Sequence, residues 1–249
     1  MNHTYLEPLF QPILDRDGEV FAYEALMRLR GHPFGPGKLV ERWENNGYIV
    51  ALDLAMVRRI GELLAANGTK PSIALNVSIV TVQKAGDAYV RALTAIAPHA
   101  GLLIVELTES VPVTNPGALV RFYAACRVQG FLVALDDCRP GHLYASPHFI
   151  DALQPQLLKL DGPYLQQCFK DSTQLAGLDR IVQAAHAAEA KVIAEFISSM
   201  ELREFAFRIG ADYVQGYALG MPGPLASTKE SVYTLSRPPD RSDSFPTVR

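Results

Sequence analysis

The chain has 249 residues, a net charge of -3 and 49% hydrophobic residues, which is the composition of a globular protein long enough to bury a large core. The sequence has no Lys/Arg cluster of the kind that binds DNA or RNA, so we expect no nucleic-acid partner. The N-terminal sequence lacks a signal-peptide pattern, and no apolar stretch is long enough to span a membrane. Three widely spaced cysteines argue against a disulfide framework or a zinc knuckle. We therefore expect a single cytoplasmic domain without a membrane partner.

In chain order, short apolar runs alternate with stretches of helical periodicity. The runs expected to form strands are residues 10–15, 20–28, 72–78, 102–109, 131–137, 157–161, 191–195 and 212–216. Apolar residues three or four apart between these runs predict helices, with shared faces at Tyr89/Leu93/Ile96, Leu119/Tyr123/Cys126 and Leu202/Phe205/Ala206/Ile209. Asn115-Pro116 predicts one helix start, and Ser198 with Glu201 matches a capping box at another.

The alternation of strand and helix predicts an α/β fold. Eight expected strands in a chain of this length favour a closed (β/α)8 TIM-like barrel over residues 1–227. An open, doubly wound sheet is the alternative, but no Gly-rich phosphate loop follows an early strand. The segment 228–249 is rich in Pro, Ser, Arg and Asp and predicts a flexible tail.

Polar side chains stand at the ends of nearly all the expected strands. They are Glu24, Asn76, Glu106, Asp136, Asp137, Lys159, Asp161, Glu195 and Gln215. Asn76, Glu106 and Asp136 are each 30 residues apart, about one βαβ unit. A single acid at a strand end is more often a helix cap or a loop partner. Several at matching positions predict a site at the barrel mouth, where the active sites of this fold lie.

The carboxylates among these residues predict a metal site. Five like charges in one cleft need cations, and oxygen ligands, with Asn76 adding a carbonyl, favour Mg²⁺ or Mn²⁺. The five carboxylates are those of Glu24, Glu106, Asp136, Asp137 and Glu195. Two such ions suit the hydrolysis of a phosphate ester. Lys159 could position the attacking water or offset charge on phosphorus, and a structural ion pair with a neighbouring carboxylate is an equally good interpretation of this lysine.

These residues resemble the EAL-domain cyclic di-GMP phosphodiesterases. Glu24-Ala25-Leu26 with Arg28 matches the family signature. The other matching motifs, in the family's order, are Phe10-Gln11-Pro12-Ile13, Asn76-Val77-Ser78, Glu106-Leu107-Thr108-Glu109, Asp136-Asp137, Lys159-Leu160-Asp161, Ala194-Glu195 and Gln215-Gly216-Tyr217.

The resemblance implies a modified (β/α)8 barrel that uses two divalent ions to open cyclic di-GMP into linear pGpG. It implies that the first metal is bound by Glu24, Asn76, Glu106 and Asp136, and the second by Asp136 and Asp137. Lys159 and Glu195 would serve the attacking water beside Glu24, and Glu109 would anchor a loop. The implied ligand contacts are Gln11, Leu26, Arg28, Asp161 and Gln215. A homodimer and a regulatory protein partner are further implications.

Two segments depart from the family pattern. The family's D-D-F-G-T-G appears as Asp136-Asp137-Cys138-Arg139-Pro140-Gly141, and its A-E-G-V-E appears as Ala194-Glu195-Phe196-Ile197-Ser198. Cys138 could be a redox or soft-metal group, but a lone cysteine is more often a small packed side chain. The complete ligand set favours the enzyme. The changed loop favours a receptor that binds cyclic di-GMP without hydrolysis, and a protein-binding adaptor is the third alternative.

Overall fold

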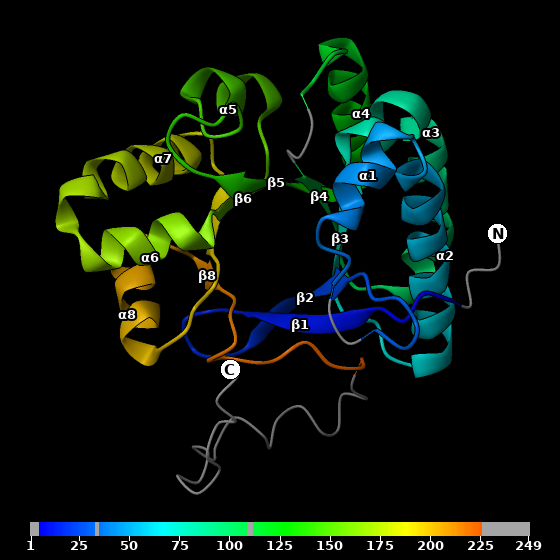
Figure 1. Ribbon diagram of the computed structural model, residues 1–249, viewed down its shortest axis with the longest axis horizontal. Coiled ribbons are helices and arrows are strands. Elements are labelled where there is room, and N and C mark those ends of the chain that lie inside the picture. The colour runs from blue at the N-terminus through cyan, green and yellow to red at the C-terminus, as the bar shows by residue number, and fades with distance from the viewer. Residues whose placement is uncertain (1–4, 33–34, 109–111, 226–249) are drawn as a thin grey trace, which may run out of the picture.

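The computed structural model describes residues 5–32, 35–108 and 112–225, and its eight strands close into one barrel in sequence order (Figure 1). The strands are β1 Leu9–Leu14, β2 Val20–Leu26, β3 Ile73–Ser78, β4 Leu103–Thr108, β5 Leu132–Cys138, β6 Leu157–Leu160, β7 Lys191–Ala194 and β8 Tyr213–Val214. The helices are α1 Leu39–Asn45, α2 Ile49–Asn67, α3 Ile79–Ile96, α4 Pro116–Val128, α5 Pro147–Leu153, α6 Gly162–Lys170, α7 Leu175–Ala187 and α8 Met200–Arg208. The eight expected strands and the closed barrel are confirmed.

The first strand makes the barrel a modified one, because β1 runs antiparallel to both of its neighbours, β2 and β8, whereas the other adjacent pairs are parallel. No described helix follows β1 in the chain before β2 begins. The chain beyond β8 packs along β1 instead: Phe10 and Gly223 exchange two backbone hydrogen bonds of 2.7 and 3.0 Å. In Figure 1 this segment runs beside β1, while α2, α3 and α4 lie on one side of the barrel and α6, α7 and α8 on the other.

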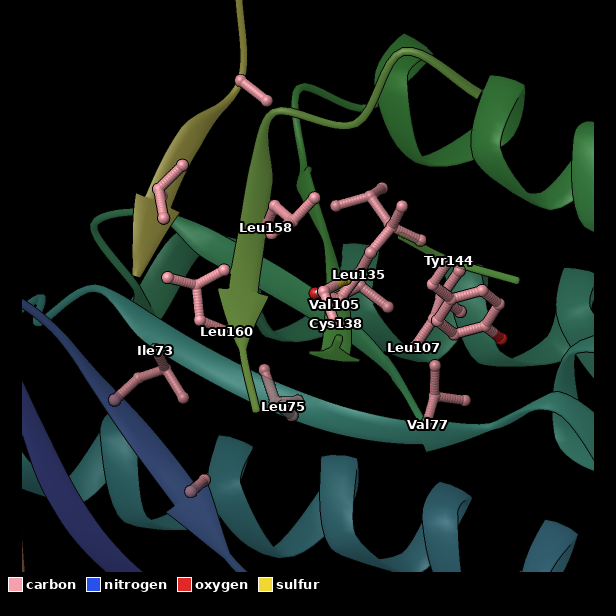
Figure 2. Close-up of a cluster of buried hydrophobic side chains, with 14 of the residues drawn as sticks. Ile73, Leu75, Val77, Val105, Leu107, Leu135, Cys138, Tyr144, Leu158 and Leu160 are labelled. Atoms are coloured by element: carbon pink, nitrogen blue, oxygen red, sulfur yellow. The ribbon is translucent and has the colours of Figure 1, made fainter. Parts of the chain in front are cut away.

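Alternation along the strands sorts the side chains into two sets. One set points outward to the helices, and Figure 2 shows part of it along β3 to β6, including Leu75, Val105 and Leu158. The inward set forms a separate apolar layer of Ile13, Ala22, Ala74, Ile104, Ala134, Leu157 and Ile193. Because successive side chains on a strand face opposite ways, the next inward residues lie two positions further along.

Those next inward residues are all polar. Two positions beyond the apolar layer in β2 to β7, and two positions before it in the antiparallel β1, stand Gln11, Glu24, Asn76, Glu106, Asp136, Lys159 and Glu195. Gln215 stands two positions after Tyr213, which packs against the same layer. The apolar layer therefore fills the barrel beneath one polar layer to which every strand region contributes.

Helix starts largely follow the sequence signals. The side chain of Asn115 accepts the Ala118 N–H at the start of α4, as expected. The start of α8 differs, because the cap is Ser199, which accepts the Leu202 N–H. The predicted capping box of Ser198 with Glu201 is therefore wrong by one residue: an extended Ser199, at φ -153° and ψ 165°, carries the chain into the helix. The expected apolar faces of α3 and α4 are buried.

None of the three cysteines is in a disulfide within the described part of the chain, and each is buried. Cys138 packs in the outward apolar set, which agrees with a structural side chain. Among the described helices, none combines the length and the apolar character needed to cross a bilayer.

A buried acid behind β3 was not foreseen. Asp53 lies on the inner face of α2, and its Oδ2 accepts the Ser78 N–H at 3.1 Å and the Thr81 hydroxyl at 2.5 Å. The Ser78 hydroxyl donates to Glu44 at 2.6 Å, so a second buried carboxylate lies nearby. Burial raises the pKa of Asp53 to about 7, although these hydrogen bonds oppose it, and the charge of Glu44 adds to the rise.

Asp53→Asn should therefore change how stability depends on pH. A raised pKa in the folded state favours folding below the unfolded value near 3.8, and this contribution is lost as pH rises toward about 7. Denaturant unfolding from pH 4 to 8 should show the free energy of unfolding of the native protein falling, relative to Asp53→Asn, by about 1.4 kcal/mol per pH unit up to pH ~7. Asp179→Asn, on the exposed face of α7, is the control. A constant difference across this range would contradict the raised pKa.

Candidate metal and phosphodiester site

Most of the polar layer opens into one cavity at the mouth of the barrel. The cavity has a volume of about 510 Å³, and its lining includes nine of the predicted site residues: Gln11, Glu24, Leu26, Arg28, Asp136, Asp137, Lys159, Glu195 and Gln215. These residues come from six different strand regions, so the barrel itself brings them together. Asn76 and Glu106 lie against this lining through hydrogen bonds to two of its members.

Lys159 lies at the centre of the carboxylates. Its side chain is 1% exposed, and its Nζ lies 2.9 Å from Glu106, 2.9 Å from Glu195, 3.3 Å from Asp136 and 3.4 Å from Glu24. Burial alone would lower the pKa of Lys159, but these carboxylates outweigh it and raise the pKa well above its usual value. The ion pairs that the sequence left as an alternative are therefore present, within the predicted site.

Amide side chains hold Glu24 in place. Asn76 donates from Nδ2 to Glu24 Oε1 at 2.7 Å, and Gln215 donates from Nε2 to Glu24 Oε2 at 2.8 Å. Gln11 continues this network, since it accepts a longer contact of 3.4 Å from Gln215 and donates to the Gly220 carbonyl at 3.0 Å. Burial acts to raise the pKa of Glu24, but Lys159 and the two amide donors outweigh it, so the pKa is lowered.

The positive charge near the other carboxylates does not offset their burial. Burial raises the pKa of Glu106 well above its usual value and that of Glu195 to about 8, despite the proximity of Lys159. Burial also raises the pKa of Asp136, and burial together with the Asp136 charge raises that of Asp137 to about 6. Five carboxylates face one ammonium group, so the cluster favours additional cations.

The donor set fits divalent metal ions. Single oxygens of Asp136, Asp137 and Glu195 all lie within 4.8 Å of one another. Glu106 is fully buried, yet its Oε1 has no hydrogen-bond partner among the residues that the structure describes. A buried carboxylate oxygen is normally satisfied, so this atom indicates a missing ligand. Oxygen donors of this kind favour hard ions over zinc.

Besides Asn76 and Glu106, one further described residue of the predicted site, Asp161, is not part of the cavity lining. Asp161 caps α6, accepting the Tyr164 N–H at 2.7 Å, and lies 3.7 Å from the Arg139 Nε. Its predicted role as a ligand contact stays a prediction. Glu109 lies outside the described residues.

The altered loop after β5 is held against α6 and α7. Asp137 adopts a left-handed φ of 51°, and its carbonyl lies 3.1 Å from the His142 Nδ1. Pro140 packs near Gly177 of α7, where an added Cβ would lie 2.9 Å from the proline ring. Together with the Arg139 contact to Asp161, these interactions give the loop a defined position beside the carboxylates.

Sequence reasoning missed part of the cavity wall. Gln166, Phe196, Ile197, Ser198, Gly216 and Tyr217 also line the cavity. Segment 196–197 lies so close to Gly216 that an added Cβ there would stand 2.2 Å from the Ile197 nitrogen, which explains the glycine. The signal for all of these residues except Gln166, which lies on α6, was their position directly after Glu195 and Gln215 at two strand ends.

The sequence is similar to those of several known proteins. The chain is 28% identical to the cyclic di-GMP phosphodiesterase PdeF of Escherichia coli K12 over 239 residues, which cover 93% of this chain and 31% of PdeF. The chain thus spans about a third of the length of the first curated relatives it matches.

Solved structures share the fold. The PaMucR phosphodiesterase in complex with c-di-GMP is 25% identical, with a TM-score of 0.74 over 89% of this chain and 93% of that one. The Bacillus subtilis YkuI protein, solved with c-di-GMP and calcium, has a TM-score of 0.76 at 22% identity over 90% of this chain and 56% of its own, which supports the fold alone. A profile described as the EAL domain matches residues 2–222, nearly the whole sequence, and on that match the chain belongs to the EAL domain family.

Proposed function

We propose that this EAL domain is a metal-dependent phosphodiesterase that hydrolyses cyclic di-GMP to linear pGpG. The observation that carries the proposal is the group of four carboxylates around the buried Lys159, with Asp137 beside them and with Glu106 Oε1, which has no hydrogen-bond partner among the described residues. The relatives named as cyclic di-GMP phosphodiesterases support the substrate. A homodimer and a regulatory protein partner belong to the same proposal through the family resemblance.

Each polar residue of the layer has a place in this reaction. Glu24, Asn76, Glu106 and Asp136 would hold one ion, and Asp136 with Asp137 a second. When bound, the ions, Mg²⁺ or Mn²⁺, supply Lewis-acid stabilisation of the phosphate and a lowered pKa for water. Arg28 lines the cavity and offers a planar guanidinium to phosphate oxygens, beside Gln11 and Gln215.

Lys159 and Glu195 would handle the proton and the developing charge. Water adds to phosphorus, the bond from phosphorus to the ribose oxygen breaks, and that oxygen takes a proton from solvent, while Glu195 returns to solvent the proton that it accepts. Glu195 would accept the proton of the attacking water, because its carboxylate lies 2.9 Å from Lys159 and within 4.8 Å of the oxygens of Asp136 and Asp137. Lys159, 2.9 Å away, keeps its positive charge for the negative charge that grows on the phosphate.

The test is incubation of the purified protein with cyclic di-GMP and Mn²⁺ or Mg²⁺, followed by chromatographic separation of the products. We expect a pGpG peak that EDTA abolishes and excess Mn²⁺ restores. The loop at residues 138–140 favours a second candidate, a non-hydrolysing receptor, for which the ligand would bind and be recovered intact. A protein that neither binds nor cleaves cyclic di-GMP would contradict both candidates.

A further inference from the structure

One wall of the cavity is aromatic and exposed. Phe196 is 58% exposed and Tyr217 is 67% exposed, and both line the same cavity as the carboxylates. The adjacent Ile197 is fully buried, so the exposure belongs to these particular side chains rather than to the whole segment. Large exposed rings inside a concave polar site indicate a contact with a ligand.

The backbone of Phe196 is also unusual. Its φ is 56°, in the left-handed region that bulky side chains rarely adopt. Glycine would take this conformation without strain, whereas a phenylalanine there costs free energy. The surrounding contacts must therefore hold the residue in place.

Those contacts come from α6 and from the segment after β8. The Phe196 ring lies on Gly162, where an added Cβ would stand 2.3 Å from ring carbons, so only glycine leaves room for it. Gln166 donates to the Phe196 carbonyl at 3.0 Å, and the next residue, Ile197, donates to the Gln215 carbonyl at 3.0 Å. The ring is thus fixed on one side and open to the cavity over most of its surface.

We propose that the exposed ring of Phe196 is a stacking surface for one nucleobase of the dinucleotide, and that Gly162 is the positioning residue that makes room for it. The inference rests on the proposed function, because a phosphodiester held at the carboxylates places its attached nucleoside against the cavity wall. Aromatic rings stack on any base, so Phe196 contributes affinity for nucleosides in general. Discrimination of guanine from adenine then falls to polar groups.

Binding of two small probes tests this without catalysis. GMP and ribose 5-phosphate carry the same phosphate group and no diester, so neither is a substrate for diester hydrolysis. Calorimetric titrations in Ca²⁺ buffer should show that the native protein binds GMP about 10-fold more tightly than ribose 5-phosphate, the gain expected from one stacked base. AMP should show a similar gain.

Four variants make the test specific. Phe196→Gly, which suits the left-handed backbone, should reduce the preference for GMP to about 2-fold or less and leave ribose 5-phosphate affinity unchanged. Phe196→Trp should keep the preference. Gly162→Ala should displace the ring and behave like Phe196→Gly, with no further loss when the two are combined. Phe169→Ala, an exposed ring on α6 outside the cavity lining, is the control and should keep the preference.

An equal GMP preference in the native protein and in Phe196→Gly would overturn the proposal. The proposal would also be overturned if the native protein bound GMP no more tightly than ribose 5-phosphate, or if it bound neither probe. A protein that fails to hydrolyse cyclic di-GMP but loses its GMP preference in Phe196→Gly would support the stacking surface while contradicting the proposed hydrolysis.

Discussion

Replacing Glu106 with glutamine is expected to abolish hydrolysis of cyclic di-GMP while leaving the protein folded. Glu106 is fully buried, and its Oε2 is 2.9 Å from Lys159 whereas its Oε1 has no described hydrogen-bond partner. Glutamine keeps the shape of the side chain but removes the negative charge that a divalent ion needs. We expect kcat to fall by at least about 10³-fold and metal affinity to fall with it.

The thermal stability of Glu106→Gln, unlike its activity, should not fall. Since burial raises the pKa of Glu106 well above its usual value, its neutral form is favoured in the metal-free protein, and glutamine has the same shape and charge as that form. The melting temperature without metal should stay equal to that of the native protein or rise, and its increase on adding Mn²⁺ should shrink. Glu41→Gln, an exposed acid on α1, is the matched control. Unchanged kcat and metal affinity in Glu106→Gln would remove this residue from the site.

Lys159→Met should have the largest effect on stability. It removes the ammonium group that lies within 3.4 Å of four carboxylates and leaves a side chain of similar length. Breaking a buried ion pair from one side typically costs about 3–5 kcal/mol, so denaturant unfolding in EDTA should show a loss of this order. Lys191→Met is the control, because its ion pair with Asp212 is 58% exposed on the lysine side and should contribute at most ~1 kcal/mol.

The same variant separates the two interpretations of Lys159. Saturating Mn²⁺ should restore much of the stability of Lys159→Met by supplying positive charge to the carboxylates. If Lys159 acts on the transition state, kcat should stay at least about 10²-fold low at that metal concentration, with little change in KM. Recovery of kcat together with stability would leave Lys159 as a structural ion-pair partner only.

The barrel could be predicted because its strands carry a clear signal. Each has an apolar run that ends in a polar residue, such as Ile104-Val105 followed by Glu106, and the motifs occur in the family's order. The direction of β1 could not be derived from composition or periodicity, since Phe10 and Ile13 would be equally apolar in a parallel strand. The chain nevertheless holds a signal for it: only residues 15–19 join β1 to β2, which is too short for a parallel crossover, and the pairing with β8 is antiparallel as well.

The site could be predicted as a set of residues but not as a network. The spacing of Asn76, Glu106 and Asp136 indicates that they share one face, and periodicity cannot show that Lys159 lies between them. Asp53 was overlooked because a single acid in an apolar helix face carries no signal for the serine and threonine that satisfy it. The left-handed backbone of Phe196 has no sequence signal beyond the departure from a family glycine.

The reversed first strand decides where mechanical load enters the barrel. Because β1 runs opposite to β2, the residues that precede it emerge at the mouth, beside the ligand cavity, rather than at the far end. There the Glu7 N–H donates to the Arg28 carbonyl at 3.0 Å, and the Arg30 N–H donates to the Tyr5 carbonyl at 2.8 Å. Tension on the chain ahead of Tyr5 would be borne first by these two bonds. The peptide group of Arg28 is therefore the first part of the cavity rim that tension on the preceding chain would displace.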